Sequence, residues 1–201
     1  MAVAAPRRAI LRVAGRLSCA VLLVAACADP EVAEQADTAS IQKALDAYAP
    51  QLADAYVVAD LEGLEEYARE HTITDARVRE IMERYAELAA LPLRERLNAI
   101  LEGFAVEKEI AGLEKRANDL LAEGRVIRPT PKSLVVESVE TWGYANAFAT
   151  TVEVWDLRVY AAGTDVLLSE TLDQRNRVKY QLQRQDDTWL VLFRELDATF
   201  E

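Results

Sequence analysis

The clearest pattern of hydrophobic and polar positions lies near the end of the chain, in residues 177–196. Large apolar residues occupy every second position on both sides of a polar turn at 185–188: Val178, Tyr180, Leu182, Trp189, Val191 and Phe193. Alternation on both arms of a turn is typical of a half-buried β-hairpin. Because an isolated hairpin is only marginally stable, another part of the chain must cover its apolar face.

Three stretches before the hairpin also have the composition of strands. Residues 134–141 are rich in β-branched side chains, residues 147–160 form a long apolar segment, and residues 166–172 lead toward the hairpin with a bend near Asp173. Turn sequences containing glycine separate these stretches. The sequence therefore predicts an antiparallel meander of four strands over residues 132–197.

Residues 40–123 have helical spacing. In the first part, apolar residues recur every three or four positions: Ile41, Leu45, Tyr48, Leu52 and Tyr56. This stripe crosses Pro50, so it predicts one kinked helix or two nearly collinear ones. Asp60, Thr74 and Pro92 suit the starts of later helices, and Gly124 suits an end. The pattern of residues 92–124 does not decide whether they form one helix or two. It also does not show what residues 74–123 do in the fold. Helices followed by strands predict an α+β fold, with the helices packed on a curved sheet.

The first 26 residues have the properties of an export signal. They contain four arginines and no acidic residue, and the apolar run 17–26 ends at Cys27. This run is too short for a bilayer, which needs about 20 residues, but it fits the core of a signal peptide. The sequence Leu23-Val24-Ala25-Ala26-Cys27 resembles the lipobox of bacterial lipoproteins. This resemblance implies a signal peptide at residues 1–26, acylation of Cys27 and attachment to a bilayer of the cell envelope, facing the periplasm or the exterior.

The alternative to a lipoprotein signal is an ordinary secretory signal. It would be cut after one of the alanines before Cys27 and would leave a free thiol. Residues 28–39 are polar and acidic with little periodicity, so we expect Cys27 and these residues to form a flexible tether at 27–39, followed by one domain over 40–201.

The charge of the chain bears on its partners. The net charge is −11, and without the four arginines of the leader 19 basic and 34 acidic residues remain, a net charge of −15. Such a surface repels phosphate backbones, so we expect no nucleic-acid partner.

The closing hairpin also resembles a known family. The sequence Val178-Lys179-Tyr180-Gln181-Leu182-Gln183-Arg184, followed by Trp189-Leu190-Val191, is similar to the end of nuclear-transport-factor-2-like domains. Within that superfamily it is most similar to the IMS domain of plastid-division proteins and their bacterial relatives. The resemblance covers residues 40–70 and 132–196. It implies a cone-like curved sheet around helices, sometimes with a pocket at its open end, and dimerisation through the sheet. The helical residues 74–123 depart from this pattern.

Few residues in the chain suggest catalysis. The sequence has one histidine, and its two cysteines are Cys19 and Cys27, so we expect no zinc site, thiolate nucleophile or cofactor. Resemblance to the superfamily's isomerases implies a carboxylate in an apolar pocket, for which the candidates are Asp156 and Asp54, with His71 as a candidate base. The alternative for Asp156 is an outward-facing carboxylate paired with Arg158 or Lys179.

The leading hypothesis is an envelope lipoprotein whose domain binds a protein partner or a small apolar ligand without catalysis. The alternative is an enzyme of isomerase or dehydratase type. An acid inside an apolar cavity of at least about 300 Å³ would favour the enzyme. A sealed core filled by Trp155, Trp189 and Phe193 would exclude both an enzyme and a ligand-binding protein. The candidate partner surface is the mixed face of the hairpin: Arg177, Lys179, Gln181, Leu190 and Leu192.

Overall fold

The computed structural model describes residues 30–70 and 76–200. Its helices are α1 (Pro30–Val58), α2 (Leu61–Glu70), α3 (Ala76–Arg84), α4 (Leu93–Leu101) and α5 (Glu107–Ala122). Its strands are β1 (Arg125–Trp142), β2 (Asn146–Ala161), β3 (Leu167–Gln185) and β4 (Thr188–Phe200). They form one antiparallel sheet in the order β1-β2-β3-β4. The prediction of an α+β fold with a four-stranded curved sheet is confirmed.

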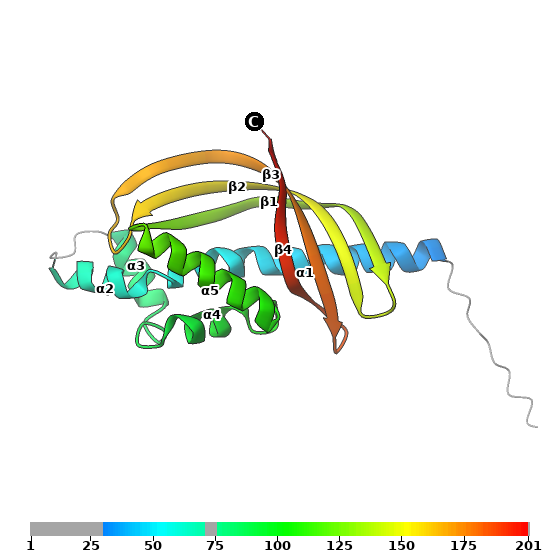
Figure 1. Cartoon of the computed structure of the whole chain (residues 1–201), viewed down its shortest axis with the longest axis horizontal. Helices are drawn as coiled ribbons and strands as arrows, with labels where there is room; N and C mark the ends of the chain where they lie inside the picture. The colour runs from blue at the N-terminus through cyan, green and yellow to red at the C-terminus, as the bar shows by residue number, and fades with distance from the viewer. Residues whose placement is uncertain (1–29, 71–75, 201) are drawn as a thin grey trace, which may run out of the picture.

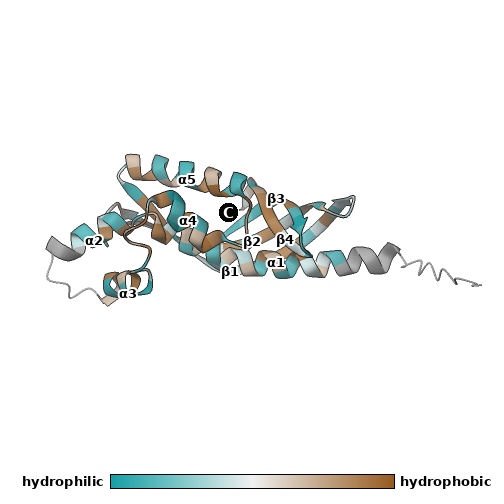
Figure 2. Cartoon of the chain, turned by 90° about the horizontal axis from the view of Figure 1, so that it is seen from below, coloured by the Kyte–Doolittle hydropathy of each residue, from teal (hydrophilic) through white to brown (hydrophobic). Residues whose placement is uncertain are grey.

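The sheet arches over the helices (Figure 1). Helix α1 runs along the long axis of the molecule beneath the arch, and α4 and α5 lie under one half of the sheet (Figure 1). Hydrophobic and hydrophilic positions alternate around α4 and α5 (Figure 2), as amphipathic helices require when one side meets a core. The concave side of the sheet thus faces the helices, and any cavity in the fold lies between these two layers.

The closing hairpin builds the core, as its alternation predicts. The side chains of Val178, Tyr180, Leu182, Trp189 and Val191 are all buried. The two-residue turn between its strands has positive φ angles at Asp186 and Asp187 (46° and 65°), which is the type I′ geometry that joins twisted strands.

Phe193 departs from the predicted pattern, and the cause is a β-bulge at Leu192. Leu182 pairs with Val191 and Gln181 pairs with Phe193, so Leu192 is an extra residue in β4. One inserted residue exchanges the two faces of a strand. Phe193 is therefore 38% exposed, and Arg194 takes the inward position opposite Tyr180. The prediction that Phe193 fills the core is wrong.

Helix α1 is one continuous helix through Pro50, which decides between the two alternatives left by the sequence. It begins at Pro30, ten residues earlier than expected, so much of the segment expected to be a tether is helical. Proline is favoured in the first turn of a helix, where its missing N–H removes no hydrogen bond. Among the described side chains of α1, the first buried one is Ile41, so core packing begins where the periodicity predicts.

Strand β1 starts at Arg125 and includes Pro129 and Pro131, which were expected to precede the sheet. Prolines are tolerated there because β1 is an edge strand, with one side free of ladder hydrogen bonds. Gln42 of α1 occupies part of that free side. Its amide donates to the carbonyl of Leu134 (3.0 Å) and accepts from the N–H of Val136 (2.8 Å), as a neighbouring strand would.

Residues 92–124, which the sequence left as one helix or two, form the two helices α4 and α5. Gly103, with a φ of 77°, ends α4, and Gly124, with a φ of 71°, follows α5 as predicted. Between the helices, Val106 donates to the carbonyl of Val191 and the N–H of Val191 donates to the carbonyl of Phe104, both at 2.9 Å. The linker thus pairs with the outer edge of β4 and fixes α5 against the sheet.

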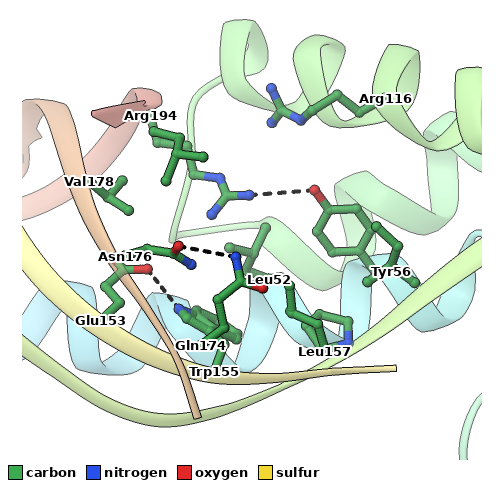
Figure 3. Close-up of a pocket in the computed structure, with 13 residues that line it drawn as sticks. Leu52, Tyr56, Arg116, Glu153, Trp155, Leu157, Gln174, Asn176, Val178 and Arg194 are labelled. Atoms are coloured by element: carbon green, nitrogen blue, oxygen red, sulfur yellow. Dashed lines mark hydrogen bonds between the residues drawn. The ribbon is translucent and has the colours of Figure 1, made fainter. Parts of the chain in front are cut away.

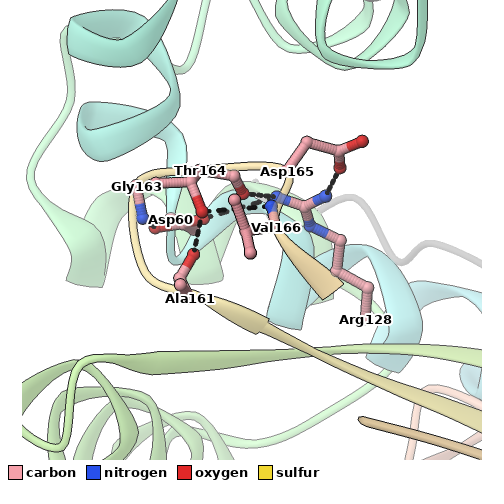
Figure 4. Close-up of polar contacts among 7 residues, drawn as sticks. All are labelled: Asp60, Arg128, Ala161, Gly163, Thr164, Asp165 and Val166. Carbon is pink, nitrogen blue, oxygen red and sulfur yellow. Dashed lines mark hydrogen bonds and ion pairs between the residues drawn. The ribbon is translucent and has the colours of Figure 1, made fainter. Parts of the chain in front are cut away.

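A buried polar cluster joins the start of α2 to the turn between β2 and β3 (Figure 4). Asp60 precedes α2 as expected, but its carboxylate accepts from the N–H of Gly163 (2.8 Å) and lies 3.6 Å from Arg128. Arg128 also pairs with Asp165 and donates to the carbonyl of Thr164. Burial raises the pKa of Asp60, against the opposing effects of the Gly163 N–H and Arg128. This cluster holds the helical end of the molecule together.

None of the helices in the described residues is long and apolar enough to cross a membrane.

Candidate ligand-binding cavity

A cavity of about 290 Å³ lies between the concave face of the sheet, α1 and α5 (Figure 3). Apolar side chains from α1 and all four strands form most of its wall. Six polar side chains also line it: Tyr56, Arg116, Glu153, Gln174, Asn176 and Arg194. A sealed core filled by Trp155, Trp189 and Phe193, which would have excluded a ligand, is therefore not formed, because the inward position opposite Tyr180 holds Arg194 in place of Phe193.

Arg194 is the charged group that the β4 bulge directs toward the cavity. Its guanidinium donates to the hydroxyl of Tyr56 at a long 3.4 Å (Figure 3), and its Nε lies 3.7 Å from Oε1 of Glu109. Both contacts are longer than a strong charge-assisted hydrogen bond of about 2.7–2.9 Å. The guanidinium thus has room to form shorter bonds with a group that enters the cavity.

Glu109 of α5 is the counter-ion of this region, with only 1% of its surface exposed. Its Oε1 is 2.9 Å from Nη2 of Arg116 and accepts from the hydroxyl of Tyr48 at 3.2 Å, whereas its Oε2 is buried and has no hydrogen-bond partner among the residues that the structure describes. Burial raises the pKa of Glu109, and the charges of Arg116 and Arg194 oppose the shift. This carboxylate keeps two guanidinium groups at one side of the cavity.

Glu153 of β2 is the buried acid that lines the cavity itself. It accepts hydrogen bonds from the Tyr180 hydroxyl (2.7 Å), the Trp155 indole N–H (2.8 Å) and the Thr151 hydroxyl (3.0 Å). Three neutral donors therefore engage both carboxylate oxygens. The group fixes the orientation of Trp155 and Tyr180, and each of its two oxygens already accepts at least one hydrogen bond from these side chains.

The predicted catalytic candidates lie elsewhere. Asp156 accepts from Lys132 (2.8 Å) and from the N–H of Asp173 (2.9 Å), and it does not line the cavity. The hydrogen bond from Lys132, followed by that from Asp173, lowers the pKa of Asp156. Its partner is thus Lys132, where the alternative expected Arg158 or Lys179. Asp54 pairs with Arg84 at 2.8 Å and is also absent from the cavity wall.

His71 and Cys27 lie outside the described residues. Within the described residues no group of histidine, cysteine, aspartate or glutamate side chains could hold a metal ion.

The predicted partner face of the hairpin is only partly assembled. Arg177 pairs with Glu137 (2.9 Å) and Lys179 with Asp197 (2.7 Å), and both are on the side of β3 opposite to the core residues, as is Gln181. Leu190, by contrast, is buried, and Leu192 is the unpaired residue of the bulge. The structure therefore places the three polar residues on one side of β3, whereas Leu190, opposite Gln183 on the neighbouring strand, is covered.

Four charged residues of the site were missed in the sequence, and two kinds of signal could have found three of them. Glu153 shares the inward alternation of Ala149 and Thr151 along β2. Glu109 and Arg116 are seven residues apart, which places them two turns apart on one side of a helix. Arg194 had no such signal, because alternation counted from Trp189 places it outside.

Comparisons with known proteins show only weak similarity. No protein-family model matches the sequence, and no curated protein sequence matches it. Among solved structures, the intermembrane space region of the chloroplast protein ARC6 is similar, with a TM-score of 0.40 and 15% identity over 62% of this chain and 97% of that one. A periplasmic fragment of TraM is similar with a TM-score of 0.38 and 14% identity over 52% of this chain and 80% of that one. Both likenesses are weak, and membership of the nuclear-transport-factor-2-like superfamily stays a prediction.

Proposed function

We propose that the protein is a lipoprotein of the bacterial cell envelope, anchored through Cys27, whose domain binds a small amphipathic ligand without catalysis. The observation that carries the binding proposal is the Arg194 guanidinium, which lines a largely apolar cavity and lies 3.4 Å from the Tyr56 hydroxyl and 3.7 Å from the Glu109 carboxylate, both long contacts. The sequence that supports the anchor is the basic leader, the short apolar run and the lipobox-like residues that end at Cys27.

The cavity sets the size of the ligand. Its volume of about 290 Å³ is close to the lower end of ligand sites, which begin at about 300 Å³. The walls contributed by Trp155, Leu157 and Leu196 favour an apolar body, because burying such surface removes it from water. We therefore expect a single short chain or ring.

The cationic side of the cavity sets the head group. Arg194 and Arg116 both line it, and guanidinium groups form paired hydrogen bonds with planar anions such as carboxylates. Glu109 offsets part of their charge from outside the cavity wall. An anionic head beside the two arginines and an apolar body toward Trp155 is the arrangement that satisfies both sides.

An isomerase or dehydratase has less support. A carboxylate that acts as a base must reach the substrate proton, and the oxygens of Glu153 are engaged by three donors. Glu109 does not line the cavity and pairs with Arg116. The groups free to act in the cavity bind anions, and a protein partner on the domain surface is the remaining alternative.

Decanoate and decylammonium, which share a chain and differ in charge, test the ligand class. We expect decanoate to bind more tightly in isothermal titration calorimetry. Arg194→Gln should weaken decanoate binding by about 10–100-fold, the loss of a hydrogen bond to a charged group. Arg116→Gln, at a more exposed residue, should act in the same direction and covers the possibility that Arg194→Gln does not fold.

Arg184→Gln is the matched control for that experiment. Arg184 is on the same sheet, pairs with Asp187 at the hairpin turn and does not line the cavity, so the variant should keep its affinity. Equal binding of the two probes, or equal loss in the control, would exclude an anion site. If neither probe binds, capture of envelope proteins with the lipidated chain tests the protein-partner alternative.

The anchor has its own test. Cys27→Ala should release the protein from the membrane fraction and abolish labelling by radioactive palmitate. Cys19→Ala is the matched control, because Cys19 is the other cysteine of the leader and lies eight residues before the lipobox cysteine. Labelling that persists in Cys27→Ala would refute the lipoprotein assignment.

A further inference from the structure

The turn between β1 and β2 carries several exposed aromatic residues, and they lie in a stretch of sequence that has no charged side chain. Residues 141–152 contain no charged side chain, although 28% of the chain is charged. Three aromatic residues of this segment are exposed: Trp142 (42%), Tyr144 (96%) and Phe148 (48%). We refer to these three as the tip aromatics. Monomeric proteins rarely leave clustered large apolar side chains exposed unless another surface covers them.

The tip aromatics form a defined structure. The rings of Trp142 and Phe148 lie 4.4 Å apart and pack against each other across the two strands. Gly143, with a φ of 67°, makes the turn, and the N–H of Arg184 donates to the carbonyl of Ala145 at 2.8 Å. Strand β3 therefore holds the turn in place, so the tip moves with the whole domain.

The tip is at the end of the molecule from which α1 begins. Figure 1 shows the β1–β2 turn and the start of α1 at the same end, with α2 and α3 at the other. Pro30 is three residues after Cys27, and the helix reaches its first buried residue at Ile41. Eleven helical residues span about 16 Å, at about 1.5 Å per residue. A chain held to a bilayer at Cys27 thus keeps the tip close to that bilayer.

We propose that the tip aromatics lie in the interfacial layer of the membrane that anchors the protein. This inference rests on the proposed anchor at Cys27. Tryptophan and tyrosine favour this layer, because an apolar ring enters the lipid while the polar N–H or O–H keeps contact with water. The neighbouring turn of β3 and β4 carries Asp186 and Asp187, which favour water and limit the depth of entry.

Charge favours the tip over the rest of the surface. The acidic chain is repelled by anionic lipids, whose surface potential is negative. The uncharged segment 141–152 is the part of the sheet where this repulsion is weakest. Contact at the tip orients the domain with α2 and α3 away from the bilayer.

The test uses the full chain, recovered with its lipid and reconstituted into phosphatidylcholine vesicles. Separate vesicles carry bromine on the acyl chains near the head groups or near the bilayer centre. Bromine quenches tryptophan fluorescence only at short range, and the other two tryptophans, Trp155 and Trp189, are buried in the core. We expect quenching by the shallow bromines, little by the deep ones, and loss of that quenching in Trp142→Phe, which keeps an aromatic ring but removes the reporter.

A second pair of variants keeps the reporter and changes the surface. Replacing Tyr144 and Phe148 together by serine should remove most of the quenching. In unanchored Cys27→Ala protein added to the same vesicles, the double change should weaken binding by about tenfold, which corresponds to about 1.4 kcal/mol. Phe200→Ser, at an equally aromatic but distant position at the end of β4, is the matched control and should change neither measurement.

The outcomes separate this inference from the anchor. Protein that carries palmitate but shows no quenching of Trp142 overturns the membrane contact and leaves the anchor intact. Protein that lacks palmitate refutes the anchor, and the membrane contact then depends on the vesicle binding of the Cys27→Ala protein. If Trp142 is protected only as protein concentration rises, without lipid, the tip binds a second copy of the chain and the inference is wrong.

Discussion

Replacement of Trp189 by alanine tests whether the closing hairpin is part of the core. Trp189 is buried, packs in the central hydrophobic cluster and donates from its indole N–H to the hydroxyl of Ser40 at 3.1 Å. The residue therefore links β4 to α1 in two ways, by packing and by a hydrogen bond. Its removal leaves a cavity at the junction of the two layers.

The structure sets the expected size of the loss. Removal of a buried tryptophan costs about 3–5 kcal/mol of the free energy of unfolding, because the lost burial and the new cavity add. For a domain of this size, that loss lowers Tm by roughly 6–20 °C. Urea unfolding of the Cys27→Ala protein, followed by circular dichroism, should show a lower midpoint with an unchanged dependence on urea concentration.

Two controls separate the contributions. Ser40→Ala removes the hydrogen bond alone and should cost about 1 kcal/mol. Trp142→Ala makes the same chemical change at an exposed residue and should cost at most about 1.5 kcal/mol in the absence of membrane, because it loses the ring contact with Phe148 but leaves no cavity in the core. A loss below about 1 kcal/mol in Trp189→Ala would mean that the hairpin face is not packed, and the assignment of the core would be wrong.

Two further predictions concern close packing and pH. A Cβ on Gly63 would clash with the Cα of Gly163, so Gly63→Ala should lower the free energy of unfolding by about 1–3 kcal/mol. At Gly112 the nearest atom to a new Cβ is the flexible end of Arg116 at 3.4 Å. Gly112→Ala should therefore stabilise α5 by about 0.5–1 kcal/mol in the same unfolding assay. Burial raises the pKa of Glu109 in the folded protein above its value of about 4.3 in the unfolded chain. The stability that comes from its protonation is therefore fully present below the pKa of the unfolded chain and is lost as pH rises through the pKa of the folded protein. Glu109→Gln should therefore gain stability relative to the wild type as pH rises from about 4 toward neutrality, and a constant difference across this range would contradict the shift.

Much of the fold could be predicted from the sequence because the periodicity of its core is strong. The stripe from Ile41 to Tyr56 crosses Pro50 without a change of phase, and α1 is continuous there. The bend expected near Asp173 is present, where that residue has a φ of 53°. The alternation at 177–196 predicted the closing hairpin and, except for Phe193, its buried face.

The errors come from features that alternation does not report. The sheet was expected to begin after Pro129 and Pro131, but β1 includes both, because an edge strand leaves alternate N–H groups unused and accepts prolines. The bulge at Leu192 has no residue signature in β4, so the inward position of Arg194 could not be derived by counting from Trp189. Glu109 and Glu153 were overlooked because acids are rarely buried unless partners satisfy them, and the tyrosine hydroxyls that bond to them come from distant parts of the chain.

The extra residue in β4 divides the strand into two parts, and each part is placed by its own partners on β3. A deletion of Leu192 alone would make the strand regular, while Val191 stayed opposite Leu182 and Arg194 stayed opposite Tyr180. Phe193 would remain on the outer side, and the cavity would keep its cation. The pairing with β3, and not the number of residues in β4, therefore decides which side chains face the interior, so relatives could lose this residue without a change in the chemistry of the cavity.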